Sequence, residues 1–512
     1  MRLTRNTTIA AFALVFIASE LCAADQPFQL SPAGQRRAAD RQARTTTLKN
    51  FPDMMRKANA QYITVQAGTC QWLIGLKAKD EATKISDEIE KLDDKNSALA
   101  ALKKGIEGLA SDAPLDEAGK KELATRTRNA KKTRAGGLVD AAKSLYTSGL
   151  PRQAYELILQ AVELDPDHPG AHQALGQSKA GENWADAFSA SQIQKGMTYL
   201  SDYGWVPTAA VERTKKDEWF DNGRWLPLAD ADQAHSVLAT PWVIETPHFT
   251  IRSTGPRKRA VALGERLENF YQVVYHEYLE FFLRGEKKPQ MSFTHAPAKK
   301  MLVHQFGDKK DYETTIKNDL KNPILKPFIP FLTMLPGFYV QVSHASYFQV
   351  GDDNAFQQIF TLNMVTRQIL CEYTQGGSPE PKPWILGGSA EMLMVAKPGD
   401  DGKWYVPASH AHQSVITATE LFNNGGLLPL ATLLSMEKNV YDKEPANKDN
   451  NATAGALSRF LIDTKDGIYA LDFLEFLHDG IKNPKGTAPL SDYLGMDIPE
   501  LDKMFREFLA RK

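Results

Sequence analysis

The chain has 512 residues, of which 42% are hydrophobic and 24% are charged, and its formal net charge is −1. These values are ordinary for a globular protein of two or three domains and exclude a chain that is disordered throughout. They leave no basic surplus to release counterions from nucleic acid or an anionic membrane, so neither partner is expected.

The first 24 residues have the pattern of a secretory signal peptide. Arg2 and Arg5 precede the apolar run IAAFALVFIA, and small residues follow it before Asp25. That run is too short to span a bilayer, and no later stretch is long enough. We therefore predict an exported protein, periplasmic or extracellular, with no transmembrane anchor.

Two cysteines remain once the signal peptide and its Cys22 are removed, namely Cys70 and Cys371. A disulfide between them is possible in an oxidising compartment. A chain of this length does not need such a crosslink, so the sequence favours two buried free thiols in different domains.

Residues 25–136 are expected to form a helical region. Between residues 80 and 109, apolar residues recur every three or four positions among many Lys, Asp and Glu, which predicts a helical hairpin with a solvated charged face. The polar segment that follows is expected to stay helical and to end at Gly136 and Gly137.

Residues 137–199 contain a helical repeat. Small or apolar residues recur at helical spacing from residue 141, and Leu175-Gly176 repeats the positions of Ala141-Ala142 thirty-four residues later. The segment therefore resembles a tetratricopeptide repeat (TPR), whose period has that length. With one full unit and the start of another, it is either a peptide-binding groove or a helix pair that supports the next domain.

Residues 200–236 form a linker with a short internal repeat. Gly204-Trp205-Val206-Pro207 is echoed by Arg224-Trp225-Leu226-Pro227. This pattern predicts short hairpins whose Trp side chains pack against neighbouring elements, in preference to an aromatic platform for a ligand. Asp221-Asn222-Gly223 predicts a tight turn.

Residues 237–512 are expected to form an α+β domain with a small sheet and a mainly helical C-terminal half. Residues 242–254 alternate like an edge strand or hairpin and lead into an amphipathic helix. One or two strands are predicted within residues 291–306, and a strand pair is predicted at 337–342 and 345–350. Four later apolar segments predict separate helices.

The segment from Phe360 to Leu393 is central to the functional argument. It predicts a helix, a turn-rich break and a second helix that opens near Trp384. Helical spacing predicts one buried face on the first helix, formed by Leu362, Val365, Ile369 and Leu370. Asn363 and Arg367 are four residues apart and share another face, with Met364 beside them.

This order of elements resembles the peptidase-MA-like, gluzincin-type (zincin) domains of secreted bacterial proteins. ETPHFTIRST with LGERLENFYQVV is similar to their opening hairpin and first helix, and GFYVQ with ASYFQ to the sheet beside their active site. IFTLNMVTRQILCEYT stands where active members carry HExxH, and KPWILGGSAEML stands where they carry the third-ligand helix. The resemblance covers roughly residues 140–512 and implies a zinc-peptidase fold.

The resemblance places Asn363 and Arg367 at the two His ligand positions, Met364 at the general base and Gly387 at the third-ligand Glu. An HExxH helix needs two imidazoles for zinc and a carboxylate that activates the metal-bound water. Arg367 instead puts a fixed positive charge where the metal would sit, and two such charges ~4 Å apart repel by several kcal/mol. The sequence therefore predicts a pseudopeptidase without a metal cofactor.

Arg367 needs a carboxylate partner if it is buried, and the sequence predicts an ion pair with Glu372 or Glu391. These three residues are the candidate lining of the former cleft.

Two other histidine motifs give weaker metal signals. The HExxE motif from His276 to Glu280 lacks a second histidine and predicts a solvent-exposed polar face. His410 and His412 could present two imidazoles but have no carboxylate nearby in the sequence. Zinc is expected only if the chain is an active enzyme with atypical ligands.

The sequence favours an exported, non-catalytic pseudopeptidase whose gluzincin-like scaffold binds a protein or peptide. An active metallohydrolase or peptidase with unusual ligands stays open as an alternative. So does an interaction module that binds its partner through the TPR-like segment.

Overall fold

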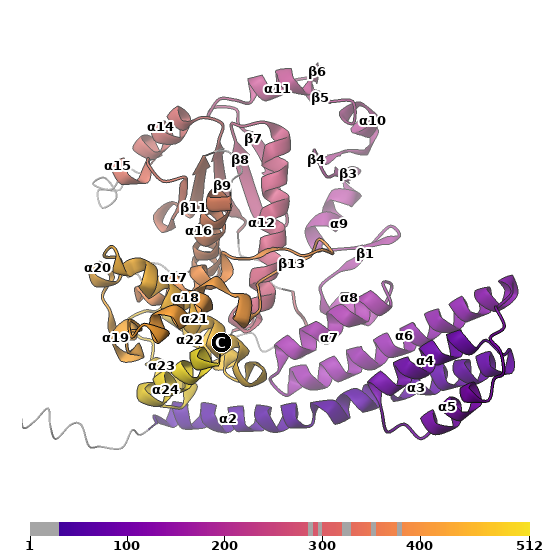
Figure 1. The fold of residues 1–512 in the computed structure, drawn as a ribbon. Helices are drawn as coiled ribbons and strands as arrows, with labels where there is room; N and C mark the ends of the chain where they lie inside the picture. Colours follow the sequence, from indigo (N-terminus) through magenta and orange to yellow (C-terminus); the bar gives the residue numbers. More distant parts are fainter. Residues whose placement is uncertain are drawn as a thin grey trace, which may run out of the picture.

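A computed structural model describes residues 30–284, 290–294, 299–319, 329–349, 355–375 and 381–511. Helices dominate both ends of the chain and a five-stranded sheet lies between them, so the predicted α+β class is confirmed (Figure 1). The predicted signal peptide and the break at residues 376–380 lie outside the described residues. Within the described ranges, no helix combines the length and the apolar character that crossing a membrane requires.

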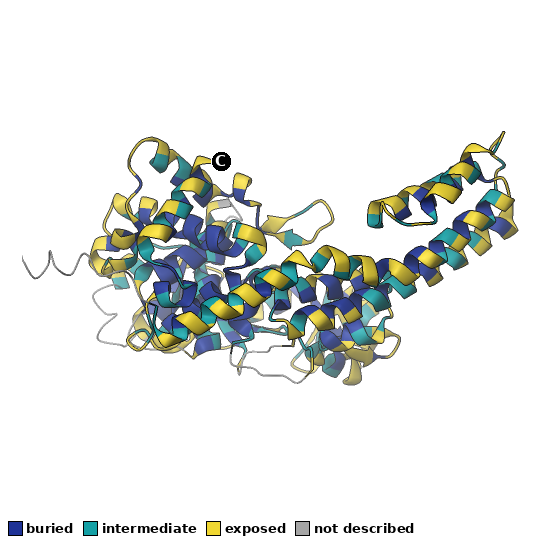
Figure 2. Ribbon diagram, turned by 90° about the horizontal axis from the view of Figure 1, so that it is seen from below, coloured by how far each residue is buried: buried dark blue, intermediate teal, exposed yellow. Residues whose placement is uncertain are grey.

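Residues 30–147 form an extended helical region. Its helices are α2 (Pro32–Lys49), α3 (Phe51–Gly75), α4 (Lys79–Leu92), α5 (Leu99–Glu107) and α6 (Glu117–Thr147). Helices α3 to α6 extend from the body as an arm with its own apolar core, which includes Ile89 and Leu102 (Figure 1). Bands of buried and exposed residues alternate along the arm (Figure 2). The predicted helical hairpin at residues 80–109 is confirmed as α4 and α5.

Helix α6 does not end at Gly136 and Gly137 as the sequence predicted. It continues to Thr147, and the glycines serve packing instead. A Cβ added at Gly137 would lie 2.1 Å from the carbonyl oxygen of Ala58, so the backbones of α3 and α6 touch there. The expected boundary between the helical region and the repeat therefore falls inside one continuous helix.

The TPR-like segment forms a helix pair. Helix α7 (Pro151–Leu164) packs on the end of α6 through small and apolar residues with 0% exposure, namely Ala142, Leu145, Ala154, Ile158 and Ala161. The next helix, α8 (Pro169–Ala174), is only six residues long. The chain then passes into a run of hairpins.

Three short hairpins follow in residues 178–227, each with a Trp in its second strand. They are β1–β2 (Ser178–Ala180 and Asn183–Ala185), β3–β4 (Met197–Leu200 and Gly204–Pro207) and β5–β6 (Glu218–Asp221 and Arg224–Pro227). The sequence predicted the second and third of these, and it missed the first. The predicted turn at residues 221–223 is confirmed, because Asn222 and Gly223 both have positive φ.

Each hairpin Trp packs against the helix that precedes its hairpin, so the predicted packing role is confirmed. The pairs are His172–Trp184, Phe188–Trp205 and Arg213–Trp225, at 4.3, 6.3 and 4.1 Å respectively. The connecting elements are α9 (Ala187–Gln194), η1 (Thr208–Ala210), α10 (Val211–Thr214) and α11 (Leu228–Ala234). The pattern continues into the sheet, where Trp242 stacks on His235 just after α11.

The sheet has the strand order β10-β11-β9-β8-β7. Its strands are β7 (Trp242–Glu245), β8 (Phe249–Ser253), β9 (Met301–Phe306), β10 (Gly337–Val340) and β11 (Ala345–Gln349). Strands β8, β9 and β11 are parallel, and β7 and β10 are antiparallel edges. The predicted hairpin at 242–254 and strand pair at 337–350 are confirmed, and the described part of residues 291–306 contains one strand.

Different helices cover the two faces of the sheet. On one face, Val303 and Phe348 join Leu267 of α12 (Arg257–Glu277) and Val365 of α16 (Ala355–Thr374) in the main core. On the other face, a smaller cluster packs around Tyr312 of α14 (Lys309–Asp319). The connecting elements are α13 (Leu279–Phe282), α15 (Ile329–Leu332) and η3 (Gln341–Ser343).

The C-terminal half is mainly helical, as predicted. After α16 come α17 (Pro383–Leu393), β12 (Lys397–Pro398), β13 (Trp404–Tyr405), η4 (Ser409–Ala411), α18 (Gln413–Asn423), α19 (Leu430–Ser435), α20 (Lys438–Tyr441), α21 (Ala446–Gly467), α22 (Ala470–Lys482), α23 (Leu490–Leu494) and α24 (Ile498–Ala510). Cys70 and Cys371 are buried free thiols in α3 and α16, which resolves the question that the sequence left open.

Buried ion pairs tie the first described helix to the C-terminal half. Arg41 and Arg44 of α2 bind the Asp472 carboxylate of α22, at 2.7 and 2.9 Å. Asp472 is only 2% exposed, and Arg44 is only 6% exposed. The guanidinium of Arg37 lies 3.8 Å from the ring centroid of Tyr493. Helix α2 therefore packs against the C-terminal helices and leads into the arm.

We expect Asp472→Ala to lower the free energy of unfolding by about 3–5 kcal/mol, because it leaves two cationic side chains buried without their carboxylate. Asp140→Ala is the matched control, since its pair with Lys143 is exposed and such pairs contribute little. Urea unfolding measures both. Equal effects of the two changes would contradict a structural role for the Asp472 pairs.

Candidate functional site

Helix α16, which carries Asn363, Met364 and Arg367, has the predicted buried face. Leu362, Val365, Ile369 and Leu370 are at most 3% exposed. On another face of α16, Arg367 Nε donates a hydrogen bond to Asn363 Oδ1 at 3.1 Å. Met364 is partly buried and packs on the apolar clusters of both sheet faces. Asn363, Met364 and Arg367 therefore lie close together on α16, as predicted.

Gly387 lies on α17 where other side chains fill the available space. A Cβ there would lie 2.7 Å from Asn451 Oδ1 and 3.1 Å from Tyr441 Oη. Those two groups are bonded to each other, because the Tyr441 hydroxyl donates a hydrogen bond to Asn451 Oδ1 at 3.0 Å. A glutamate at position 387 would have to displace both.

The same helix approaches α21 closely at the next residue. A Cβ at Gly388 would lie 2.8 Å from the carbonyl oxygen of Ala454, which is backbone and cannot turn aside. On α21, a Cβ at Gly455 would meet Ser414 Oγ at 2.8 Å and Glu391 Cγ at 3.0 Å. Glycines on both helices thus set the distance between α17 and α21.

Glu391 is the carboxylate of this site. Burial raises its pKa to about 7, although the positive charges of Arg367 and Lys448 act to lower it. Burial also raises the pKa of Tyr441, against the influence of Arg367. A guanidinium, a carboxyl group and a phenol from three different helices therefore interact at one place.

Glu372, the other predicted partner of Arg367, is held at the sheet edge. It accepts hydrogen bonds from the Tyr339 hydroxyl at 2.7 Å and pairs with His344 Nδ1 at 3.0 Å. Glu391 is the carboxylate whose pKa responds to Arg367. A direct ion pair between Arg367 and Glu391 stays a prediction.

The donor set does not fit zinc. Asn363 offers a neutral amide, Arg367 a cation, and Gly387 no side chain in a space that Tyr441 and Asn451 occupy. Across the described ranges, no group of three or more His, Cys, Asp or Glu side chains could hold a metal ion. We derive no metal-dependent step for these residues.

The structure does not bring His410 and His412 together as metal ligands. His412 is buried, and both of its ring nitrogens are engaged. Nε2 contacts the Met392 carbonyl oxygen at 2.8 Å, and Nδ1 accepts from the Ser414 amide at 3.2 Å at the start of α18. His410 is exposed.

The HExxE motif is not the exposed polar face that the sequence predicted. Glu280 is 5% exposed and pairs with Arg152 of α7 at 3.0 Å. Glu277 pairs with Arg459 of α21 at 3.0 Å. Arg459 also binds Asp463 at 2.7 Å. These pairs link α7 to α13 and α12 to α21, so Glu280 is buried and Glu277 is partly buried.

Sequence reasoning missed Tyr441, Lys448 and Asn451 as members of the site. They lie on α20 and α21, in a polar stretch with no recognisable motif. The only clue was indirect, because the small residues Gly387 and Gly388 imply a close neighbour without identifying it.

Comparison with known proteins does not extend this interpretation. No protein-family model matches the chain, and a search of curated proteins finds no match. The site is therefore interpreted from its own residues.

We expect Gly388→Ala to lower the free energy of unfolding by about 1–3 kcal/mol, because the new methyl group overlaps a backbone carbonyl of α21. Gly68→Ala in α3 is the control, since nothing lies within 4 Å of its Cβ. That change is expected to stabilise the protein by about 0.5–1 kcal/mol. Urea unfolding of both variants tests the pair, and a tolerated Gly388→Ala would contradict the close approach.

The raised pKa of Glu391 predicts a pH-dependent stability. The folded protein holds this proton up to a pKa of about 7, whereas the unfolded chain loses it near 4.5. Stabilisation is therefore complete below the unfolded pKa and is lost as the pH rises through the folded pKa. As the pH rises between these values, the free energy of unfolding of the wild type should fall by on the order of 3 kcal/mol relative to that of Glu391→Gln, whose side chain does not titrate. Urea unfolding across this pH range measures the difference.

The exposed Glu420 provides a matched control. Glu420→Gln should keep the wild-type pH profile. Parallel profiles for wild type and Glu391→Gln would show that Glu391 does not titrate between pH 4.5 and 7.

Proposed function

We propose that this chain is an exported, non-catalytic pseudopeptidase on a gluzincin-like scaffold, and that its former cleft binds a protein or peptide. The observation that carries the proposal is the occupation of the ligand positions by an internally bonded cluster. Arg367 donates to Asn363, and Tyr441 and Asn451 fill the space beside Gly387. A guanidinium in a metal-binding position opposes a dication by charge alone.

The order of elements supports the scaffold. A hairpin, a long helix, a mixed sheet and two helices that meet at the candidate site follow in the sequence that the resemblance implies. The export part of the proposal rests on residues 1–24, where positive charge precedes an apolar run and small residues.

The chemistry of the cluster supports peptide binding over hydrolysis. Arg367 can donate to carboxylates and peptide carbonyls, and the partly buried Asn451 carries a further polar group nearby. Met364 cannot accept a proton from water, so the general base of the zinc mechanism is missing. Such a site can hold a chain without cleaving it.

A single assay separates binding from cleavage. Fluorescent casein peptides are mixed with the full chain, and binding is followed by fluorescence polarisation while mass spectrometry follows peptide integrity. We expect saturable binding with intact peptides, and an affinity about tenfold lower for Arg367→Ala, because a charged hydrogen-bond donor is lost. Arg506→Ala is the control, since Arg506 pairs with Asp502 on its own helix, α24, and with the Leu428 carbonyl oxygen.

Two results would contradict the proposal. Peptide cleavage that a chelator abolishes would show an active metallopeptidase. Unchanged binding by Arg367→Ala would place the peptide site elsewhere, as in the TPR-like alternative.

A further inference from the structure

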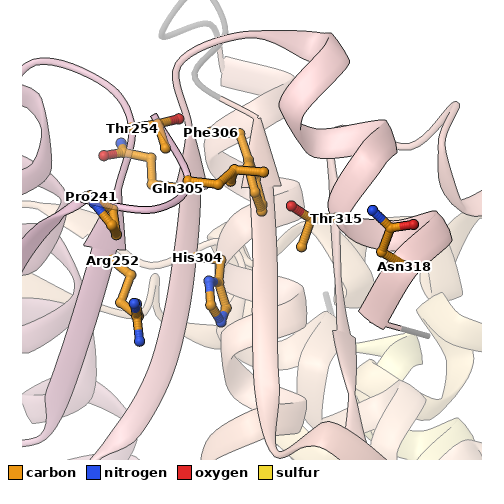
Figure 3. A pocket seen from close by; sticks show the side chains of 9 residues that line it. Pro241, Arg252, Thr254, His304, Gln305, Phe306, Thr315 and Asn318 are labelled. Carbon is orange, nitrogen blue, oxygen red and sulfur yellow. The ribbon is translucent and has the colours of Figure 1, made fainter. Parts of the chain in front are cut away.

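A cavity lies on the sheet face opposite α16. Its volume is about 330 Å³, within the range of small-molecule sites. Nine residues line it, namely Leu238, Pro241, Arg252, Thr254, His304, Gln305, Phe306, Thr315 and Asn318. Figure 3 shows Arg252 and His304 side by side on adjacent strands, with Thr315 and Asn318 on the neighbouring helix.

Backbone register fixes this arrangement. Arg252 of β8 pairs with His304 of β9, and Tyr347 of β11 is the neighbour of His304 on its other side. The rings of His304 and Tyr347 stack with centroids 5.0 Å apart. Tyr347 belongs to the apolar cluster under α14, so Arg252 and His304 share that face. The cavity is therefore separate from the Arg367 site, which lies beyond the other face.

The cavity lies at the carboxyl ends of the parallel strands β8 and β9, just before α14 begins. Open sheets with parallel strands commonly bind ligands at this end, because the connecting loops diverge there and leave a crevice. Leu238 and Pro241, from the segment before β7, close one side.

Four polar side chains of the cavity have no side-chain hydrogen bond or ion pair within the described part of the protein. They are Arg252, His304, Thr315 and Asn318. Thr315 is only 7% exposed, so its uncommitted hydroxyl faces the cavity instead of bulk solvent. Arg252 and Asn318 are exposed and His304 is partly buried, so a ligand in the cavity would replace water as their hydrogen-bond partner.

The charge of the lining is positive. No Asp or Glu is among the nine lining residues, and the Arg252 guanidinium stands uncompensated at the opening. Burial and the charge of Arg252 lower the pKa of His304 to about 4, so this ring is neutral at physiological pH and offers one N–H donor. Phe306, Pro241 and Leu238 add an apolar wall.

We propose that this cavity binds a small organic carboxylate. The charged end pairs with the guanidinium of Arg252, whose planar fork matches a carboxylate. His304, Thr315 and Asn318 supply further hydrogen bonds, and the body of the ligand lies against Phe306 and Pro241. This inference does not depend on the proposed function of the α16–α17 site.

Benzoate, its neutral analogue benzamide and inorganic phosphate are suitable probes for the full chain. Saturation-transfer NMR with titration should give a saturable benzoate signal with Kd in the millimolar range or tighter. Benzamide and phosphate should bind at least tenfold more weakly, because the first lacks the charge and the second lacks the apolar body.

Matched variants locate the binding. Arg252→Gln should raise the Kd for benzoate about tenfold or more, and Thr315→Val should raise it about threefold. Arg224→Gln is the control, since Arg224 is likewise exposed on a strand and lies outside the cavity. Unfolding midpoints confirm that each variant is folded.

Several outcomes would overturn the proposal. These are an absence of saturable benzoate binding, equal binding of benzoate and benzamide, phosphate binding in preference to benzoate, or full affinity in Arg252→Gln.

Discussion

The close approach of α17 to α21 is the constraint on which the interpretation of this protein depends. Gly388 lies against the backbone of Ala454, and Gly387 lies against Asn451 and Tyr441. A glutamate at position 387 would have to displace both of those side chains. A carboxylate at this position would therefore require more than one substitution.

The same packing assembles a polar cluster around Glu391. The Glu391 side chain packs beside Gly455. Burial raises the pKa of its carboxyl group, and the charge of Arg367 on α16 acts to lower it. Arg367 and Glu391 both influence the pKa of Tyr441 on α20. Buried ion pairs also join distant parts of the chain. Arg152 of α7 pairs with Glu280 of α13, and Arg44 of α2 pairs with Asp472 of α22. Each pair needs both of its residues, because removing one leaves an unpaired charge in the interior and destabilises the fold.

Local patterns predicted most of the fold. Apolar periodicity gave α16 and the C-terminal helices, and the Asn222-Gly223 turn gave its hairpin, because these signals depend on neighbouring residues. Features that depend on distant partners were missed or misread. Gly137 looked like a helix end but serves contact with α3, and Glu277 and Glu280 looked exposed until Arg459 and Arg152 were placed beside them. For the same reason, spacing predicted that Asn363 and Arg367 share a face, and the resemblance made them and Met364 candidate site residues, whereas nothing local indicated Tyr441 or Asn451.

Zinc content tests the central claim most directly. Equilibrium dialysis of the full chain against zinc, followed by elemental analysis, should leave far less than one tightly bound zinc per chain, and the Asn363→Ala variant should not differ. One zinc per chain that is lost on changing Asn363 or Glu391 would contradict the account, because it would show a working metal site where the structure places an amide, a guanidinium and a glycine.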